Sequence, residues 1–332
     1  MQRQEAYNAA REKRTVRTLL ESDYLLGVCD EARMGALRYR ISAGEAFLAV
    51  RMENSIPPWV RLRELEAAAR SLELGSAVGE SLRKDLDLLL APGSSLGGAR
   101  PKATVQDEQG GLWIAKFPSS NDLFDVGLAE ALVYELARSC GLNTTETELV
   151  QASDKGSTFL AKRFDRKGRQ RVHFASAMTF LGKTDGDNAR TGISYLEIAE
   201  AIRELSCCPR QDLHELFKRI VFSIAISNTD DHLRNHGFLL GAHGWGLSPL
   251  FDVNPNPYGR ALSLNISEFD NRCSFRLALS QAQYFDYEEK QAQGCIRETC
   301  EVVAGWEAQA RRLGMDAATR DAIRPAFKVE DD

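Results

Sequence analysis

Hydrophobic and polar positions repeat with different periods along this chain. Over residues 61–75 the apolar side chains recur every three or four positions, which predicts a helix that ends at Gly75. A second helix is expected over residues 79–90. The first part of the chain, residues 1–93, is therefore expected to be mostly helical.

Strand-like alternation replaces the helical period after residue 93. A Gly110-Gly111 turn separates two short alternating runs, a pattern typical of a β-hairpin. The elements expected here are strands over 103–105 and 112–117, a helix over 126–140, and a second hairpin from strands 158–164 and 170–174. Residues 94–180 are thus predicted to form a small lobe with a sheet.

The remaining chain, residues 181–332, has an almost wholly helical pattern. Ser194 and Glu197 match a capping box at the start of one helix, and a long apolar helix is expected over 213–226. A short apolar strand over 247–251 is the exception. Strands followed by helices indicate an α+β protein with a larger helical lobe after the sheet.

Composition excludes several classes of protein. The chain has 332 residues, of which 43% are hydrophobic and 27% charged, as in globular proteins. Its net charge of −5 argues against an autonomous nucleic-acid binder. No apolar run reaches the roughly 18–20 residues that cross a bilayer, and the first twenty residues lack the apolar core of a secretory signal. Seven cysteines without a C-x-x-C pair indicate reduced thiols in a cytoplasm, and the adjacent Cys207 and Cys208, which match no zinc spacing, are expected to be incidental.

The first candidate functional feature is a glycine-rich stretch at residues 94–102, SSLGGARPK. Glycines let the main chain approach a phosphate group and turn successive N–H groups toward it. The stretch matches neither G-x-x-x-x-G-K-[ST] nor G-x-G-x-x-G. By itself it is more typical of an ordinary hairpin loop.

Lys116, on the strand that follows, is the second feature. Alternation places it on the same strand face as Ile114. A strand lysine shortly after a glycine-rich loop resembles the lysine that binds ATP phosphates in kinases. Its usual partner is a helix glutamate, which Glu130 or Glu135 on the next expected helix would supply. A solvated lysine on an edge strand is the plainer alternative.

The third and fourth features follow the long apolar helix. Asp230 and Asn235 are five positions apart, as are the catalytic Asp and the metal-binding Asn of the protein-kinase loop. Asp252 stands at the end of the expected strand, where kinases have their magnesium-binding Asp. A carboxylate bridges to phosphate oxygens only through a cation. Asn235 and Asp252 therefore imply Mg²⁺.

Each feature also has an ordinary explanation. Asp230 could cap a helix, while Asn235 and Asp252 could occupy turns. His232 and His236 beside two aspartates could instead belong to a metal hydrolase, although that site would need a third ligand or a glutamate base. The order of the features along the chain favours nucleotide binding.

Taken in order, these motifs resemble those of the HipA-like serine/threonine kinases, the toxins of bacterial type II toxin–antitoxin modules, over residues 94–327. The matching stretches are SSLGGARPKA, LWIAKFPSSND, FLAKRFDR, RVHFASAMTFLG, NTDDHLRNHGF, LSPLFDVNPNP and the helix that carries Glu130. The resemblance implies a two-lobed, protein-kinase-like α+β fold with an all-helical larger lobe. It also implies ATP and Mg²⁺ as cofactors and a protein hydroxyl as phosphate acceptor.

The same resemblance assigns roles to individual residues. Asp230 would be the catalytic base, and Asn235 and Asp252 would hold Mg²⁺. Glu130 would pair with Lys116. The expected ATP-binding residues are Gly97, Gly98, Ala99, Arg100, Pro101, Lys102, Lys116, His232, Asn235 and a hinge of Lys162, Arg163 and Phe164, whose main chain would hold the adenine.

The resemblance further implies regulation and partners. Ser95 would be an autophosphorylation site whose modification ejects the ATP-binding loop and silences the kinase. The partners would be a helix-turn-helix antitoxin of the HipB type, which alone would contact DNA, and a protein substrate such as an aminoacyl-tRNA synthetase. Residues 1–60 resemble the tail of a further N-terminal module, so either the chain is short there or a separate protein supplies that module. Two other functions stay open: a small-molecule phosphotransferase on the same scaffold, and a non-catalytic module that binds antitoxin or DNA.

Overall fold

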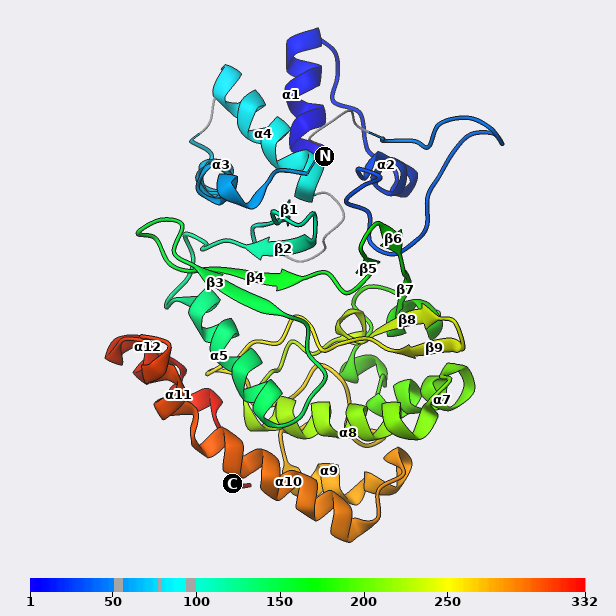
Figure 1. Cartoon of the computed structure of the whole chain (residues 1–332), viewed down its shortest axis with the longest axis vertical. Coiled ribbons are helices and arrows are strands. Elements are labelled where there is room, and N and C mark those ends of the chain that lie inside the picture. Colours follow the sequence, from blue (N-terminus) through cyan, green and yellow to red (C-terminus); the bar gives the residue numbers. More distant parts are fainter. Residues whose placement is uncertain (51–55, 77–78, 94–99, 332) are drawn as a thin grey trace. The chain divides into compact units, whose positions relative to one another are not determined.

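The computed structural model describes residues 1–50, 56–76, 79–93 and 100–331. The chain forms two compact units, the first from Met1–Leu123 and Glu148–Arg171, the second from Phe124–Thr147 and Val172–Asp332. Figure 1 gives the order of the elements along the chain. Within the described residues, no helix combines the length and the apolar character that a membrane span requires.

The first unit is built on a four-stranded sheet with helices packed beside it (Figure 1). The strand order is β1 (Lys102–Gln106), β2 (Leu112–Lys116), β4 (Thr158–Lys162) and β3 (Thr147–Val150). The helices are α1 (Gln2–Glu12), α2 (Glu21–Gly27), η1 (Trp59–Arg61), α3 (Leu62–Leu74) and α4 (Gly79–Gly93). Leu65 of α3 is fully buried in one core with Val105 and Leu160 of the sheet, so burial of apolar surface holds α3 on the strands.

Asp107 shapes the turn between β1 and β2. Its carboxylate accepts hydrogen bonds from the N–H groups of Gln109 and Gly111, at 3.0 and 2.6 Å. Gly110 has φ +83°, a left-handed conformation that favours glycine. The Gly110-Gly111 turn and the first hairpin are therefore confirmed.

The second expected hairpin is wrong in its pairing. β4 pairs with β2 and not with the following run. A two-residue hairpin joins β5 (Arg166–Lys167) to β6 (Gln170–Arg171), and β7 (His173–Ser176) pairs with β8 (Gly237–Gly241) in the second unit. Local alternation predicts a strand but not its partner, because β7 and β8 are distant in the sequence.

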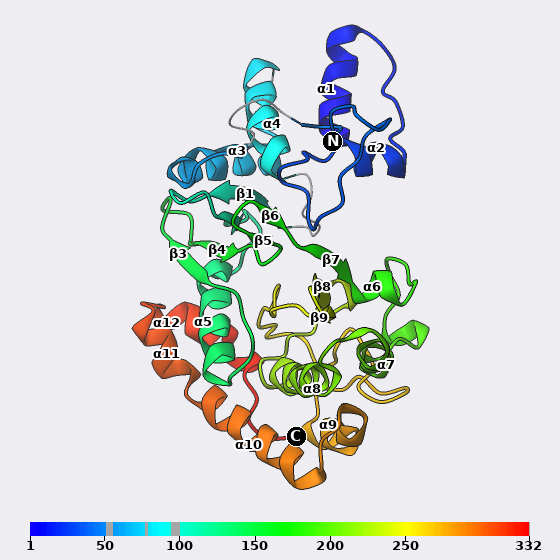
Figure 2. The same cartoon turned by 45° about the vertical axis from the view of Figure 1, so that its right-hand side comes forward.

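The second unit combines a three-stranded antiparallel sheet, β7-β8-β9, with most of the helices (Figure 2). Its central helix, α8, buries most of its side chains in a single core. The remaining elements are α5 (Val126–Ser139), α6 (Ala177–Phe180), η2 (Ala189–Thr191), α7 (Tyr195–Leu205), α8 (Pro209–Ala225), η3 (Leu233–Asn235), β9 (Gly244–Leu247), α9 (Phe275–Ser280), η4 (Ala282–Phe285), α10 (Glu289–Ala304), α11 (Trp306–Arg312), α12 (Ala317–Ile323) and η5 (Arg324–Ala326).

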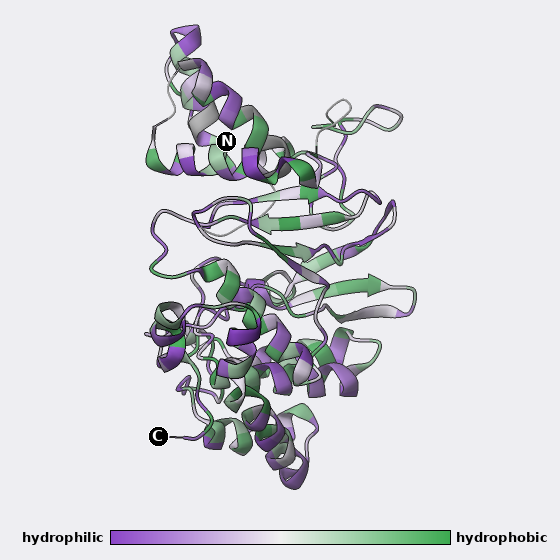
Figure 3. Ribbon diagram, turned by 60° about the vertical axis from the view of Figure 1, so that its left-hand side comes forward, coloured by the Kyte–Doolittle hydropathy of each residue, from purple (hydrophilic) through white to green (hydrophobic). Residues whose placement is uncertain are grey.

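Two predicted helix ends are confirmed, whereas the helix predicted over 213–226 begins four residues earlier, at Pro209. Helix α3 ends at Gly75, whose φ is +64°, and α7 begins with the capping box of Ser194 and Glu197. Figure 3 shows largely hydrophobic strands and helices that alternate between hydrophobic and hydrophilic stretches, as helices with one buried face do. Periodicity was thus a sufficient guide to these helices.

Two expectations for the second unit are wrong. It is not all-helical, because β8 and β9 form a hairpin directly after residues 230–235. The strand expected over 247–251 is instead β9, which ends at Leu247. Glycines occupy both ends of β8 and two positions of β9, and glycine is a weak strand former, which hides both strands from pattern analysis. The unit also includes α5, which the sequence analysis had assigned to segment 94–180.

Candidate active site

The expected nucleotide-binding residues are divided between the two units. The first unit carries Arg100, Pro101, Lys102, Lys116, Lys162, Arg163 and Phe164, and the second carries Glu130, Asp230, His232, Asn235 and Asp252. Ser95, Gly97, Gly98 and Ala99 lie outside the described residues. The pairing of Lys116 with Glu130 would join the two units and stays a prediction.

Lys102 and Lys116 are directly opposite each other on β1 and β2. Opposite residues of an antiparallel pair project from the same face of the sheet, and like charges at such positions are unfavourable. Lys116 is buried, and its ammonium nitrogen lies 5.9 Å from the centroid of the Phe159 ring. A phosphate group bound on this face would be attracted by both ammonium groups.

Arg100 and Pro101 anchor the end of the glycine-rich stretch to the sheet. The guanidinium of Arg100 donates two hydrogen bonds to the Asp122 carboxylate, at 2.9 and 2.7 Å. The carbonyl of Pro101 accepts a hydrogen bond of 2.9 Å from the N–H of Phe117. The side chain of Arg100 is thus held by an internal carboxylate, and its contact with ATP stays a prediction.

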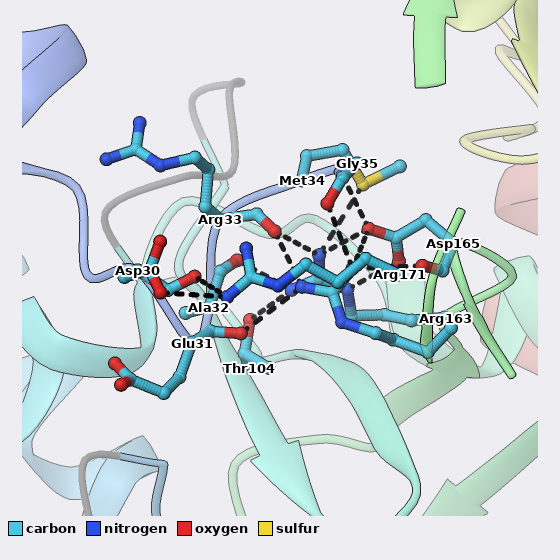
Figure 4. A network of polar contacts seen from close by, with 11 residues as sticks. Asp30, Glu31, Ala32, Arg33, Met34, Gly35, Thr104, Arg163, Asp165 and Arg171 are labelled. Atoms are coloured by element: carbon cyan, nitrogen blue, oxygen red, sulfur yellow. Dashed lines mark hydrogen bonds and ion pairs between the residues drawn. The ribbon is translucent and has the colours of Figure 1, made fainter. Parts of the chain in front are cut away.

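Arg163, in the expected hinge, has its hydrogen-bonding groups engaged within the first unit. Its N–H donates to the carbonyl of Leu112 at 2.8 Å, which continues the pairing of β4 with β2. Its guanidinium is fully buried and donates to the carbonyl of Ala32 at 2.7 Å and to the carboxylate of Asp165 (Figure 4). Hydrogen bonds of Arg163 therefore connect the expected hinge to the N-terminal part of the chain.

Asp165 is the centre of this buried network (Figure 4). Its carboxylate accepts hydrogen bonds from the N–H of Gly35 at 2.7 Å, from Arg163 at 2.9 and 2.8 Å, and from Arg166 at 2.6 Å. Burial alone would raise the pKa of Asp165, but the hydrogen bonds and positive charges of the two arginines lower it. Burial lowers the pKa of Arg166 to about 10, against the attraction of Asp165. Asp165 lies in the stretch FLAKRFDR, where the sequence pattern indicated no role for it.

The two adjacent aspartates after α8 have different surroundings. Asp230 is exposed, whereas Asp231 is buried. Asp231 accepts a hydrogen bond of 2.7 Å from the hydroxyl of Tyr195, and its second oxygen lies 3.0 Å from Nε2 of His236. Burial would raise the pKa of Asp231, but the charge and hydrogen bond of His236 and the Tyr195 hydroxyl lower it. Asp231 thus holds the loop in place, while Asp230 is exposed to solvent.

Asn235 is buried on η3, and its orientation is fixed. Its side-chain nitrogen donates to the main-chain carbonyl of Asp230 at 3.0 Å. Amide and carboxylate oxygens are the donors that Mg²⁺ takes in proteins, so Asn235 and Asp252 fit that ion. Nδ1 of His232 is buried without a hydrogen-bond partner among the described residues.

Asp252 follows in a segment that hydrogen bonds to the same loop. The N–H of Asn254 donates to the side chain of Asn228 at 3.3 Å, and the Asn256 amide donates to the Thr229 hydroxyl at 2.7 Å. Asp252 itself has φ +56°, in the left-handed region that few residues other than glycine adopt. Backbone strain of this kind gathers at ligand-binding sites.

The structure brings Asp230, Asn235 and Asp252 onto two adjoining loops of one unit. Across the described part of the chain, no group of three His, Cys, Asp or Glu side chains is arranged to hold a metal. The metal-hydrolase alternative needs a third ligand, and among the described residues none joins His232 and His236 in such a group.

Tyr195 and Asp231 were missed by the sequence analysis. Tyr195 is the first residue of α7, and nothing in its local pattern indicates a contact with a loop 36 positions later. The one sequence feature that could have indicated Asp231 was the pair of adjacent aspartates in NTDDHLRNH, because two neighbouring carboxylates seldom have the same role.

The comparisons with known proteins agree with this arrangement. The family model of the HipA-like C-terminal domain matches residues 94–306. A Haemophilus influenzae protein named "Putative kinase" is 29% identical over 187 residues, which cover 50% of this chain and 54% of that protein. The Sinorhizobium fredii "Putative kinase Y4dM" is 29% identical over 239 residues, 64% of this chain and 56% of that protein. The chain thus matches little more than half the length of these curated relatives.

A solved structure shares the fold. HipA of Shewanella oneidensis MR-1, in a complex with HipB and its operator DNA, matches with a TM-score of 0.66 and 15% identity. The match covers 96% of this chain and 79% of that chain. The prediction of a kinase-like α+β fold is therefore confirmed. Because the family model spans more than half of its length, the chain belongs to the HipA-like C-terminal domain family.

Proposed function

We propose that this chain is an ATP-dependent protein serine/threonine kinase and the toxin of a type II toxin–antitoxin pair. The observation that carries the kinase proposal is the loop around Asp230. An accessible carboxylate there shares a unit with a fixed amide, Asn235, and with Asp252 on the adjoining segment. This is the donor set that phosphoryl transfer from a metal-bound nucleotide needs.

The residues would divide the work by charge and position. Asp230 would accept the proton of the acceptor hydroxyl and orient its oxygen toward the γ-phosphorus. Asn235 and Asp252 would hold Mg²⁺, which neutralises charge on the phosphate oxygens when bound. Lys102 and Lys116 of the first unit would bind phosphate groups of the nucleotide. Little covalent chemistry is required of the protein, so positioning and charge stabilisation account for the rate.

Contacts within the first unit limit which main-chain groups of the expected hinge could bind adenine. The N–H of Arg163 is engaged with Leu112, so adenine would meet other main-chain groups of residues 162–164. The side chain of Arg163 is turned into the buried network with Asp165. Its role toward ATP would be to hold the hinge in place.

The toxin part of the proposal rests on family membership. HipA of Shewanella oneidensis is named as part of a complex with HipB and operator DNA, which supports a helix-turn-helix antitoxin as partner here. An aminoacyl-tRNA synthetase is the substrate class that the sequence resemblance implies. Ser95 would be the site of self-phosphorylation. Phosphate on Ser95 in protein purified from wild type but not from Asp230→Ala would support that role, and equal amounts in both would exclude it.

Nucleotide binding tests the site directly. ATP with Mg²⁺ should raise the melting temperature of the wild-type chain, and Asp252→Ala should lose the part of the shift that depends on Mg²⁺. The matched control is Asp321→Asn, an exposed carboxylate of the same unit. An ATP shift in EDTA that added Mg²⁺ leaves unchanged would contradict the metal assignment. No ATP shift under any condition would contradict the nucleotide site.

A further inference from the structure

Two adjacent cysteines precede α8 in the second unit, and both are exposed. The sulfur atoms of Cys207 and Cys208 lie 3.9 Å apart. The other five cysteines are buried or half-buried: Cys29, Cys140, Cys273, Cys295 and Cys300. The pair is therefore the one place in the described chain where two thiols meet at the surface.

The main chain of the pair is held on both sides. The N–H of Cys207 donates to the carbonyl of Trp245 on β9 at 2.8 Å, and the N–H of Cys208 donates to the hydroxyl of Ser206 at 3.0 Å. That hydroxyl in turn donates to the buried carboxylate of Asp212 at 2.6 Å. The two thiols are thus presented from a fixed backbone, so little ordering is needed before they act together.

The geometry favours a bridging atom over a disulfide. The Cα atoms of adjacent residues are about 3.8 Å apart across a trans peptide, which is shorter than the roughly 4.4–6.8 Å that disulfides span. Two sulfurs bound to one soft ion at about 2.3 Å lie roughly 3.3–3.8 Å from each other for bond angles near 90–110°. The observed separation needs only a small adjustment to reach the second arrangement.

The protonation of the Cys208 thiol also favours a ligand that binds both sulfurs. The hydrogen bond between the two thiols, together with the nearby charge of Cys207, raises the pKa of the Cys208 thiol. A thiol with a raised pKa is a poor nucleophile toward reagents that react with a single thiolate. A ligand that binds both sulfurs and releases both protons is limited less, because the second bond is intramolecular.

The number of protein ligands distinguishes a site for a soft ion from a zinc site. Structural zinc sites take four protein ligands. In the part of the chain that the structure describes, no third Cys, His, Asp or Glu joins these two sulfurs in a metal-binding group. Two thiols alone suit a soft centre that is satisfied by two sulfur bonds.

We propose that Cys207 and Cys208 form a dithiol binding site for trivalent arsenicals. With phenylarsine oxide, each sulfur forms one bond to arsenic and the arsenic–oxygen double bond breaks. The oxygen leaves as water with the two thiol protons, and no atom changes its oxidation state. The site is independent of the proposed kinase function.

Binding of phenylarsine oxide to the full chain tests the proposal. After removal of free reagent, the wild type should retain one equivalent, which a dithiol competitor removes and a monothiol at equal thiol concentration does not. Cys207→Ser and Cys208→Ser should each bind about a hundredfold more weakly or worse, because the chelate is lost. Cys300→Ser, which removes a half-buried thiol, should bind as the wild type does.

Trp245 provides a second measurement. Its carbonyl accepts the Cys207 N–H, so bridging the thiols should change its fluorescence, and the change should be absent in Trp245→Phe. Retention of arsenic by either cysteine variant at wild-type affinity would overturn the proposal. So would a wild type that retains none.

Discussion

Lys102 and Lys116 face each other across β1 and β2, at the point where the chain leaves the glycine-rich stretch. Both ammonium groups would attract the phosphates of a bound nucleotide. Lys102→Met should therefore weaken ATP binding by about tenfold or more while changing adenosine binding far less, because adenosine has no phosphate.

Calorimetric titration with ATP, ADP and adenosine measures this difference. Lys155→Met, which removes an exposed lysine of the same unit, is the matched control. An equal loss of affinity for adenosine and ATP would show that Lys102 does not act on the phosphates.

Asp165 predicts a dependence of stability on pH. Its folded-state pKa lies below the ordinary 3.8, so its contribution is complete above that value and is lost as the pH falls through the folded-state pKa. Asp165→Asn leaves Arg163 and Arg166 without their carboxylate and should cost about 3–5 kcal/mol at pH 7. The difference from wild type should shrink by pH 3.

Urea unfolding at the two pH values measures that difference. The control is Asp154→Asn, which removes an exposed ion pair with Lys155 and should cost about 0–1 kcal/mol. A cost for Asp165→Asn that is the same at pH 7 and pH 3 would contradict the account of the network.

Tyr195→Phe tests whether the Tyr195 hydroxyl stabilises the loop that carries Asp230. The hydroxyl of Tyr195 donates to the buried Asp231, so its removal should lower the free energy of unfolding by about 1–3 kcal/mol. Tyr258→Phe, at an exposed tyrosine of the same unit, should change it by less than about 0.5 kcal/mol. Equal effects of the two substitutions in chemical denaturation would show that the Tyr195 contact is not stabilising.

The helices could be predicted from sequence, and the candidate site residues could be proposed from it, because both depend on short-range patterns. The apolar spacing of α3, its terminal Gly75 and the capping box at Ser194 are local signals. The spacing between Asp230 and Asn235 is local too, because one loop carries both residues and the Asn235 amide bonds to the Asp230 carbonyl.

The contacts that position these residues were not predictable in the same way. Asp165 receives a hydrogen bond from Gly35, 130 positions away, and the partners of β7 and β8 are 61–67 positions apart. Such pairings depend on which buried surfaces meet when the chain folds. A buried charge network leaves little trace in hydrophobic periodicity, because its charged residues have the same pattern as residues exposed to solvent.

The transfer of the γ-phosphoryl group of ATP tests the central claim most directly. With radiolabelled ATP and Mg²⁺, wild-type protein should label a protein fraction of a cell lysate. Asp230→Asn should lower turnover by about 10²–10⁴-fold while keeping ATP affinity, because only the contribution to the transition state is removed. Glu204→Gln, an exposed carboxylate on α7, should label as the wild type does. Labelling by Asp230→Asn within about tenfold of wild type, or label found only on small molecules, would contradict a protein kinase that uses Asp230.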